Sequence, residues 1–302
     1  MDKIVYWVLN MSITATLTGS VVMLIRSFTF LPRRLTVFLW SIPFLRLLCP
    51  FGLNSPYSLL ALLRSSAIGT VFAFRTVGNP TVSMTNYVML ADSYFPIVYK
   101  NARLEELMKT ASIVWAVVAF AILLTLGVLY RAAMREIRDA DLWKENLYFS
   151  EKVTTPAVYG IVHPKIVLPV CYRERETDLV LLHERTHIRS GDNLWRLLAF
   201  FVAAVHWFNP FVWLFLKTFF ADLELSCDER VLLKLGNDRA KEYASVLVEN
   251  RCRTTFASAF GGARIRDRIE RILSFKKMTR FSLVCALLFV VAVFAVLLTN
   301  AP

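Results

Sequence analysis

The stretch His183-Glu184-Arg185-Thr186-His187 decides how the rest of this chain is interpreted. It has the form His-Glu-x-x-His, and the apolar run Leu179-Val180-Leu181-Leu182 precedes it as one face of a helix. Residues four positions apart share a helix face, with about 5–6 Å between their Cβ atoms, so both imidazoles can bind one metal ion. Glu184 then reaches the open side of that ion, where a general base acts.

The helix that carries this motif has recognisable ends. Glu174, Glu176 and Asp178 lie at its expected start, where acidic side chains favour the positive end of the helix dipole. Ser190-Gly191 follows the last periodic residue, and glycine is the usual residue for a left-handed helix end. We therefore expect a helix over residues 175–189. The alternative is an ordinary polar face within a helical bundle, and the wider context has to decide.

The composition is that of a membrane protein. Of the 302 residues 56% are hydrophobic, and the mean hydropathy is +0.51, whereas soluble domains are about 45–50% apolar. The net charge of +12 lies in blocks beside apolar runs, which indicates a cytoplasmic membrane surface and contact with the lipid bilayer. No direct nucleic-acid binding is expected. The five cysteines form no C-x-x-C pair, so we expect free thiols in a reducing compartment.

Four apolar segments predict about four transmembrane helices. They cover Ile4–Ile25, Leu35–Cys49, Ala111–Leu129 and Phe281–Leu298, about 20 residues being needed to cross a bilayer. Basic residues follow the first and third segments and precede the last, and positive flanks stay in the cytoplasm. We expect a multi-pass plasma-membrane protein with its N-terminus outside and no cleavable signal peptide.

The cytoplasmic block combines short strands with helices. Strands are expected over 146–149, 157–160 and 165–169. The apolar segment 194–220 contains Asn209-Pro210, and we expect two short helices that break there, buried in protein or dipping into one leaflet. A helix over 222–235, ended by Gly236, and a further helix to about residue 252 follow. Residues 263–273 predict a basic amphipathic helix that lies against anionic headgroups.

A hydrolytic zinc site usually has three protein ligands and one open position. Glu224, within an apolar flank, is the best third ligand, and Asp228 one turn later can hold a ligating imidazole by its free N–H. Asp222 and Glu229 are the rival ligands. The alternatives are that Glu224 is a surface salt-bridge residue and that Asp228 only packs against an arginine.

Three further residues have two interpretations each. Asp192 is expected to cap the helix after Gly191, and it can also orient His187. His206 is a candidate oxyanion stabiliser, but a lone histidine in an apolar run is more often a hydrogen-bonded core residue, which we favour. Cys227 is interpreted as packing, because as a ligand it would displace the expected carboxylate.

Several motifs in fixed order resemble one family, the BlaR/MecR antirepressor family of membrane zinc metallopeptidases, of the Glu-zincin type. They lie at Thr155–Gly160, Pro164–Pro169, His183–Asp192, His206–Pro210 and Glu224–Glu229. The likeness extends over nearly the whole chain, including the apolar segments. Receptor members of the family carry an extracellular penicillin-binding sensor after the last span. Because this chain ends at Pro302, we do not carry β-lactam sensing over to it.

The resemblance implies a zinc endopeptidase that hydrolyses a cytoplasmic winged-helix repressor in signal transduction, and often itself. Zn²⁺ would be held by His183, His187 and Glu224, with Glu184 as the general base. For self-cleavage the linker after residue 273 offers Ser274 and Phe275. The rivals are a membrane quality-control metalloprotease, which shares the histidine motif, and a non-enzymatic signalling scaffold. The sequence indicates no oligomeric state and no inducing signal.

The expected fold is therefore a mainly α integral membrane protein, with about four transmembrane helices and a cytoplasmic zincin-like α+β metallopeptidase domain that contains a small sheet. The expected divisions are 1–49 for two transmembrane helices, 50–110 for an extracellular loop region, 111–130 for the third transmembrane helix, 131–280 for the metallopeptidase domain, and 281–302 for the last transmembrane helix and a short tail.

Overall fold

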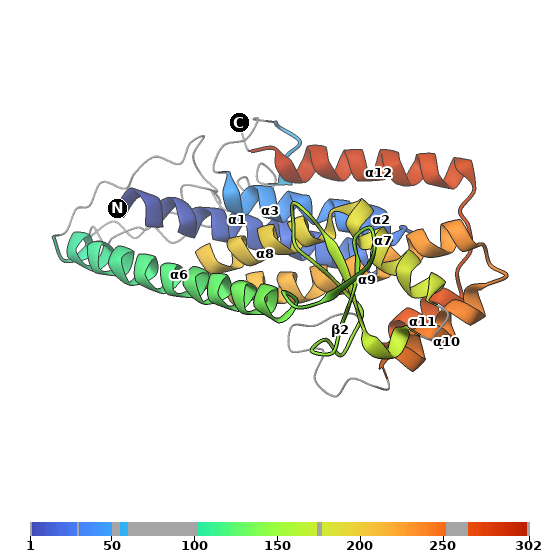
Figure 1. Cartoon of the computed structure of the whole chain (residues 1–302). Coiled ribbons are helices and arrows are strands. Elements are labelled where there is room, and N and C mark those ends of the chain that lie inside the picture. The colour runs from blue at the N-terminus through green and yellow to red at the C-terminus, as the bar shows by residue number, and fades with distance from the viewer. Residues whose placement is uncertain are drawn as a thin grey trace.

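The computed structural model describes residues 2–28, 30–49, 55–59, 102–173, 177–251 and 265–300, so most of the expected extracellular region lies outside the described residues. The described chain is mainly helical with one small sheet (Figure 1). The helices are α1 Asp2–Arg26, α2 Arg33–Leu39, α3 Ser41–Leu48, α6 Ala102–Glu136, α7 Asp178–Ser190, α8 Asp192–Val205, α9 Pro210–Leu235, α10 Ala240–Arg251, α11 Ile265–Leu273 and α12 Arg280–Leu298.

Three of the described helices are long and apolar enough to cross a membrane. They are α1 over Trp7–Arg26, α6 over Glu106–Glu136 and α12, with mean hydropathies of 1.7, 2.6 and 3.1. These correspond to the first, third and last expected spans. Helix α6 has 35 residues and is therefore about 52 Å long at 1.5 Å per residue, so it extends past the expected limits at both ends.

The expected second span over 35–49 is not one helix. The chain forms two short helices there, α2 with 7 residues and α3 with 8, and neither is long enough to cross a bilayer. Arg46 explains why α3 tolerates a charge in an apolar run. Its buried guanidinium donates to the carbonyls of Leu297 and Thr299 at the C-terminal end of α12, where a cation favours the helix dipole.

The apolar segment 194–220 breaks at Asn209-Pro210, as expected. The Asn209 side chain accepts a hydrogen bond from the Phe211 amide, and Pro210 occupies the first helical position. The helix that begins here differs from the expectation, because it continues through residue 222 to Leu235 without interruption. No glycine or proline separates 211 from 235, so one 26-residue helix carries all the acidic residues considered as ligands.

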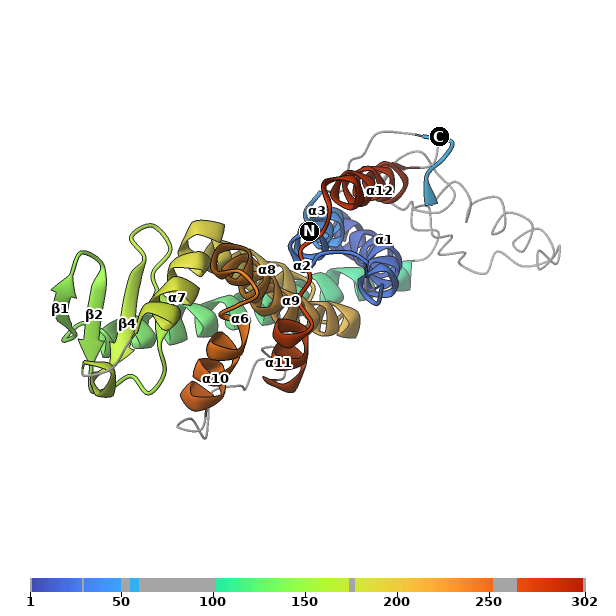
Figure 2. The same ribbon diagram turned by 90° about the vertical axis from the view of Figure 1, so that its right-hand side faces the viewer.

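A four-stranded sheet covers one side of α7. Its strands are β1 Asp141–Lys144, β2 Leu147–Ser150, β3 Ala157–Tyr159 and β4 Lys165–Pro169, in the order β1-β2-β4-β3. Strands β2 and β4 are parallel and the other pairs antiparallel; the exposed strand β1 was not expected. Phe149, Ile166 and Leu168 pack against Val180 of α7. Figure 2 shows the sheet and the α12 side at opposite ends, with α7, α8 and α9 between them.

Two carboxylates of α9 bind this helix to the α1–α2 junction. Asp222 has no exposed surface and accepts from Arg26 Nε at 2.8 Å, Arg33 Nη1 at 3.2 Å and Trp40 Nε1 at 2.9 Å. Glu229 accepts from the backbone amide of Arg33 at 2.6 Å. A buried carboxylate is stable only where donors such as these satisfy its oxygens. The two rivals for the third metal ligand are therefore engaged with the α1–α2 junction.

Replacing Asp222 with Ala should lower the free energy of unfolding by about 3–5 kcal/mol, because Arg33 then stays buried without its counter-ion. Thermal unfolding of the purified protein in detergent measures this change. Asp139→Ala is the control, because it removes an exposed ion pair with Lys152 and should have no measurable effect. Equal unfolding temperatures for the two variants would contradict a structural role for Asp222.

Candidate metal centre

Helix α7 places the two motif histidines on one buried face. His183 and His187 are 8% and 6% exposed, and their Nε2 atoms lie 3.1 Å apart. The helix ends at Gly191, whose φ of +67° is the left-handed conformation expected of a glycine helix end, and whose amide bonds back to the carbonyls of His187 and Ile188. The motif helix thus begins at Asp178, three residues later than expected, while Glu174 and Glu176 lie outside the described residues.

Helix α9 brings a carboxylate to the histidine pair. The Oε2 atom of Glu224 lies 3.8 Å from His183 Nε2, and its Oε1 atom lies 3.8 Å from His187 Nε2. Its rivals Asp222 and Glu229, on the same helix, contact the α1–α2 junction instead. Of the three acids weighed from the sequence, Glu224 is the one that faces both imidazoles.

Hydrogen bonds determine which nitrogen of each imidazole is free. The Tyr243 hydroxyl donates to Asp228 Oδ1 at 2.6 Å, so it must accept from His183 Nδ1, which lies 2.7 Å away. His187 Nδ1 donates to Asp192 Oδ2 at 2.5 Å. Both Nδ1 atoms therefore carry protons, and both Nε2 lone pairs point toward the shared centre. Asp192 orients His187 directly, whereas Asp228 reaches His183 through the Tyr243 hydroxyl, its own oxygen being 3.6 Å from Nδ1.

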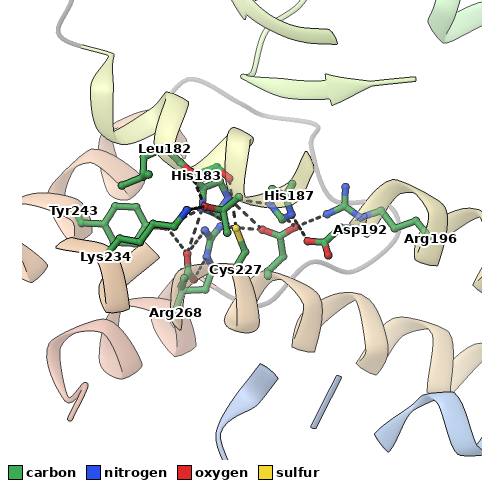
Figure 3. A network of polar contacts seen from close by, with 12 residues as sticks. Leu182, His183, His187, Asp192, Arg196, Cys227, Lys234, Tyr243 and Arg268 are labelled. Atoms are coloured by element: carbon green, nitrogen blue, oxygen red, sulfur yellow. Dashed lines mark hydrogen bonds and ion pairs between the residues drawn. The ribbon is translucent and has the colours of Figure 1, made fainter. Parts of the chain in front are cut away.

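Two arginines bind the acidic residues of the site. Arg196 of α8 donates to Glu224 Oε1 at 2.7 Å. Arg268 of α11 donates to both oxygens of Asp228 at 2.7 and 2.8 Å and lies 3.5 Å from Glu224 Oε2. In Figure 3 Tyr243 and Arg268 lie on one side of the histidine pair, and Asp192 and Arg196 on the other. The basic helix expected to face headgroups thus turns Arg268 inward, while Arg266 is exposed.

This donor set fits a zinc ion. At about 2.0–2.1 Å from a central Zn²⁺, tetrahedral ligands lie roughly 3.3 Å from one another. The observed separations of 3.1 Å between the two nitrogens and 3.8 Å from each nitrogen to the carboxylate are close to that value. Two lone pairs that face each other at this distance need a cation or a proton between them, and two imidazoles with one carboxylate are ligands that zinc accepts.

Cys227 is a second possible partner of the histidines. Its sulfur and the imidazole nitrogens lie within 4.8 Å of one another, so the thiol belongs to a set that can hold a metal. The sulfur lies 3.5 Å from His183 Nδ1, and a side-chain hydrogen bond also joins the thiol to His187. Burial raises the pKa of Cys227 to about 11, which keeps the thiol neutral. The Glu224 carboxylate, which faces both Nε2 atoms, is therefore favoured over the neutral thiol as the third ligand.

The charges around the centre differ from one group to the next. Burial lowers the pKa of His183 to about 3, whereas the pKa of His187 is raised despite burial, because Cys227, Glu224 and Asp192 face it. Burial also opposes ionisation of Glu224, but His187, Arg268 and Arg196 hold its pKa well below the usual range. Glu224 is thus an anion.

Glu184 has a different environment from Glu224. It is only 8% exposed, and burial raises its pKa, as suits a carboxylate that must take up a proton. Among the described residues none donates a hydrogen bond to its carboxylate. The group that the motif assigns to base catalysis is therefore buried beside the centre with its oxygens open to a small molecule.

Two sequence candidates lie elsewhere. His206 sits at the far end of α8 from Asp192, where its Nε2 donates to the Leu47 carbonyl at 2.9 Å and its Nδ1 accepts from Ser12 at 2.8 Å. Both ring nitrogens are engaged and the side chain has no exposed surface, so the geometry supports the core interpretation over oxyanion stabilisation. Ser274 and Phe275 follow the end of α11 and lie in the segment that leads to α12.

Sequence reasoning missed Tyr243, Arg196 and Arg268. Arg196 is one turn after Asp192 on the same helix face, a spacing that could have pointed to it. Arg268 was assigned to a lipid-facing helix because its neighbours are also basic. Tyr243 has no local signal, since only the packing of α10 against α7 and α9 brings it to His183.

Comparison with known proteins identifies a family match and three relatives. The BlaR1 peptidase M56 family model matches residues 6–270. The chain is 32% identical over 117 residues to Regulatory protein BlaR1 of Bacillus licheniformis, covering 35% of this chain and 20% of the relative. It is 26% identical over 144 residues to Methicillin resistance mecR1 protein of Staphylococcus aureus and Staphylococcus epidermidis, covering 44% of this chain and 25% of theirs. The match thus spans a quarter or less of these curated relatives.

Glu224→Gln should weaken zinc binding by more than the roughly 10–100-fold that loss of a supporting hydrogen bond causes, because a ligand itself is lost. Cys227→Ser should bind zinc as the unchanged protein does. Zinc affinity is measured by competition with a chromophoric chelator, and thermal unfolding without metal checks that both variants fold. A Cys227→Ser protein that loses zinc while Glu224→Gln retains it would reverse the assignment of the third ligand.

Proposed function

This chain belongs to the BlaR1 peptidase M56 family, and on that premise we propose that it is a membrane-embedded zinc endopeptidase. The observation that carries the proposal is the convergence of His183 Nε2, His187 Nε2 and the Glu224 carboxylate on one point, from two helices. Each imidazole has its other nitrogen committed to a buried partner. A polar face without a metal would not need both lone pairs directed at the same centre.

The reaction that this arrangement supports is peptide-bond hydrolysis. When bound, a zinc ion supplies Lewis-acid chemistry to the scissile carbonyl and to the attacking water. Glu184 accepts the proton of that water and passes it to the leaving amine, a role that its raised pKa and buried position favour. Asp192 and the Tyr243–Asp228 pair hold the two imidazoles in the tautomer that leaves Nε2 free.

The two arginines have supporting roles in this scheme. Arg196 and Arg268 hold Glu224 in its anionic form and fix its orientation toward the histidines. Arg268 also holds Asp228, so one guanidinium supports both the third ligand and the residue behind His183. The site therefore depends on α11 as well as on α7 and α9.

The proposed substrate is a cytoplasmic winged-helix repressor, cleaved as part of signal transduction. The relatives are named as a regulatory protein and a methicillin resistance protein, which favours signalling over membrane quality control. Basic residues follow α6 and precede α12, at the ends of these helices that adjoin the sheet and α11 along the chain. This supports a plasma-membrane protein with a cytoplasmic catalytic part and its N-terminus outside.

Replacing Glu184 with Gln should leave zinc bound and abolish cleavage, because the amide keeps the shape of the side chain but cannot take up a proton. The change is expected to lower the rate by about 10²–10⁴-fold or more. Comparing the proteomes of cells that carry the unchanged protein or the variant identifies the substrate. Arg185→Gln, one residue along on the exposed face of α7, is the matched control and should retain cleavage. Cleavage by the Glu184 variant would remove this residue from the mechanism.

Self-cleavage between Ser274 and Phe275 is a second activity that we propose for the same site. The segment that leads from α11 to α12 contains no helix or strand, and Phe275 is a large apolar residue within it. A fragment that ends near Ser274 should accumulate in the unchanged protein and be absent from Glu184→Gln, as seen by mass spectrometry of the intact fragments. Identical fragments from both proteins would indicate a contaminating protease.

A further inference from the structure

A cavity of about 650 Å³ lies beside the metal centre, with Asp228 among its lining residues. It is enclosed by the α1–α2 junction, α9, α11 and the segment that leads to α12. In Figure 1 α11 and the start of α12 lie at the same end of the molecule, joined by the segment between them. None of the proposed metal ligands lines the cavity, although Asp228 and the proposed self-cleavage site at Ser274 and Phe275 do.

Four basic side chains line the cavity, and their total positive charge exceeds the negative charge of the nearest counter-ions. Arg26 and Arg33 share a single carboxylate, that of Asp222. Arg271 and Lys276 are exposed, and neither forms a hydrogen bond or ion pair with its side chain to any described residue. At least two positive charges therefore face this space without a direct partner.

The acidic residues of the lining do not cancel this charge. Three of them are bound by groups of their own: Asp228 by Arg268, Glu229 by Arg34 and two backbone amides, and Glu270 by Arg266. The cations in these pairs lie outside the lining. Asp267 is the remaining acid, and it offsets one of the free basic residues. A net positive charge remains.

Arg33 gives a second and independent sign of a missing anion. Its side chain is 7% exposed, and its buried Nε–H has no hydrogen-bond partner among the described residues. Burial lowers its pKa to about 10, and the nearby Arg271 and Arg26 lower it further against the attraction of Asp222. A buried donor without a partner, next to other cations, is costly unless an anion occupies the adjoining space.

The surroundings indicate an anion with an apolar part. Phe30, which lines the cavity, is 53% exposed and its ring lies 5.7 Å from that of Phe289 on α12. Phe28, whose ring stacks on that of Phe30, and Phe281, near the start of α12, are 49% and 78% exposed. Phe30 follows the last residue of α1 by four positions and Phe281 is the second residue of α12, and both helices are apolar enough to cross a membrane. We therefore expect the basic residues at headgroup level and these rings where acyl chains begin.

We propose that this cavity binds the phosphate group of an anionic phospholipid, with Arg271 and Lys276 as its main donors and the acyl chains along Phe30 and Phe281. The bound lipid bridges the α1–α2 junction, α11 and the segment before α12. The chemistry recognised is a phosphate, which a soluble phosphate ion shares, and the experiment separates the two sources.

The test uses the purified full chain and native mass spectrometry, titrated with phosphatidylglycerol or with phosphatidylcholine. The unchanged protein should bind phosphatidylglycerol more tightly. Arg271→Gln with Lys276→Gln should weaken that binding roughly 30-fold, about fivefold for each basic residue near a membrane surface, and leave phosphatidylcholine binding unchanged. Thermal unfolding in phosphatidylcholine alone verifies that the variant is folded.

The matched control is Lys277→Gln with Arg280→Gln. It removes the same charge from the segment before α12 and from the start of that helix, but both residues are exposed and lie outside the cavity. Binding of phosphatidylglycerol by the control should match that of the unchanged protein. Equal losses in the two double variants, or no preference for the anionic lipid, would overturn the proposal. Protection against thermal unfolding by inorganic phosphate as strong as that by phosphatidylglycerol would overturn the assignment to a lipid.

Discussion

The buried contact of Asp222 with Arg26, Arg33 and Trp40 is the constraint on which the arrangement of this protein depends. It fixes the rotation and height of α9 relative to the membrane helices. Because side chains three or four positions apart share a helix face, the same helix then presents Glu224 and Asp228 toward α7 and α10. One apolar-flanked helix thus serves two environments, the membrane bundle through Asp222 and Glu229 and the polar centre through Glu224 and Asp228.

The features that the sequence predicted correctly are those that depend on local pattern. The break at Asn209-Pro210, the strand at 165–169 and the end of the motif helix at Gly191 all follow from residues within a few positions of the feature. The segment 35–49, predicted as one span, contains parts of two short helices that meet at Trp40, and its Arg46 is bound by carbonyls at the far end of the chain, which no local pattern reveals. The unbroken α9 was missed because Asp222 looks like a helix start until its buried partners are known.

The candidate site likewise contains residues that local patterns predict and residues that they do not. His183, Glu184 and His187 are positioned by helix periodicity, and Asp192 by its place after Gly191, so local reasoning reaches them. Tyr243, Arg196 and Arg268 come from three other helices, and their roles depend on packing that no single stretch encodes. The expectation for His206 followed from its type alone, whereas its ring in fact joins α8 to α1 and to the end of α3.

Arg268 gives the last span a thermodynamic connection to the metal centre. The guanidinium is shared between Glu224 and Asp228, and it stands on α11, from which a short segment leads directly into α12. Detaching α11 would leave two buried carboxylates without their common counter-ion, so occupancy of the centre and docking of α11 are reciprocal by linkage. A bound metal contributes free energy to the docking of α11, and a force that displaces α12 must overcome this contribution. When α11 is displaced, the free energy of metal binding is weakened by the same amount.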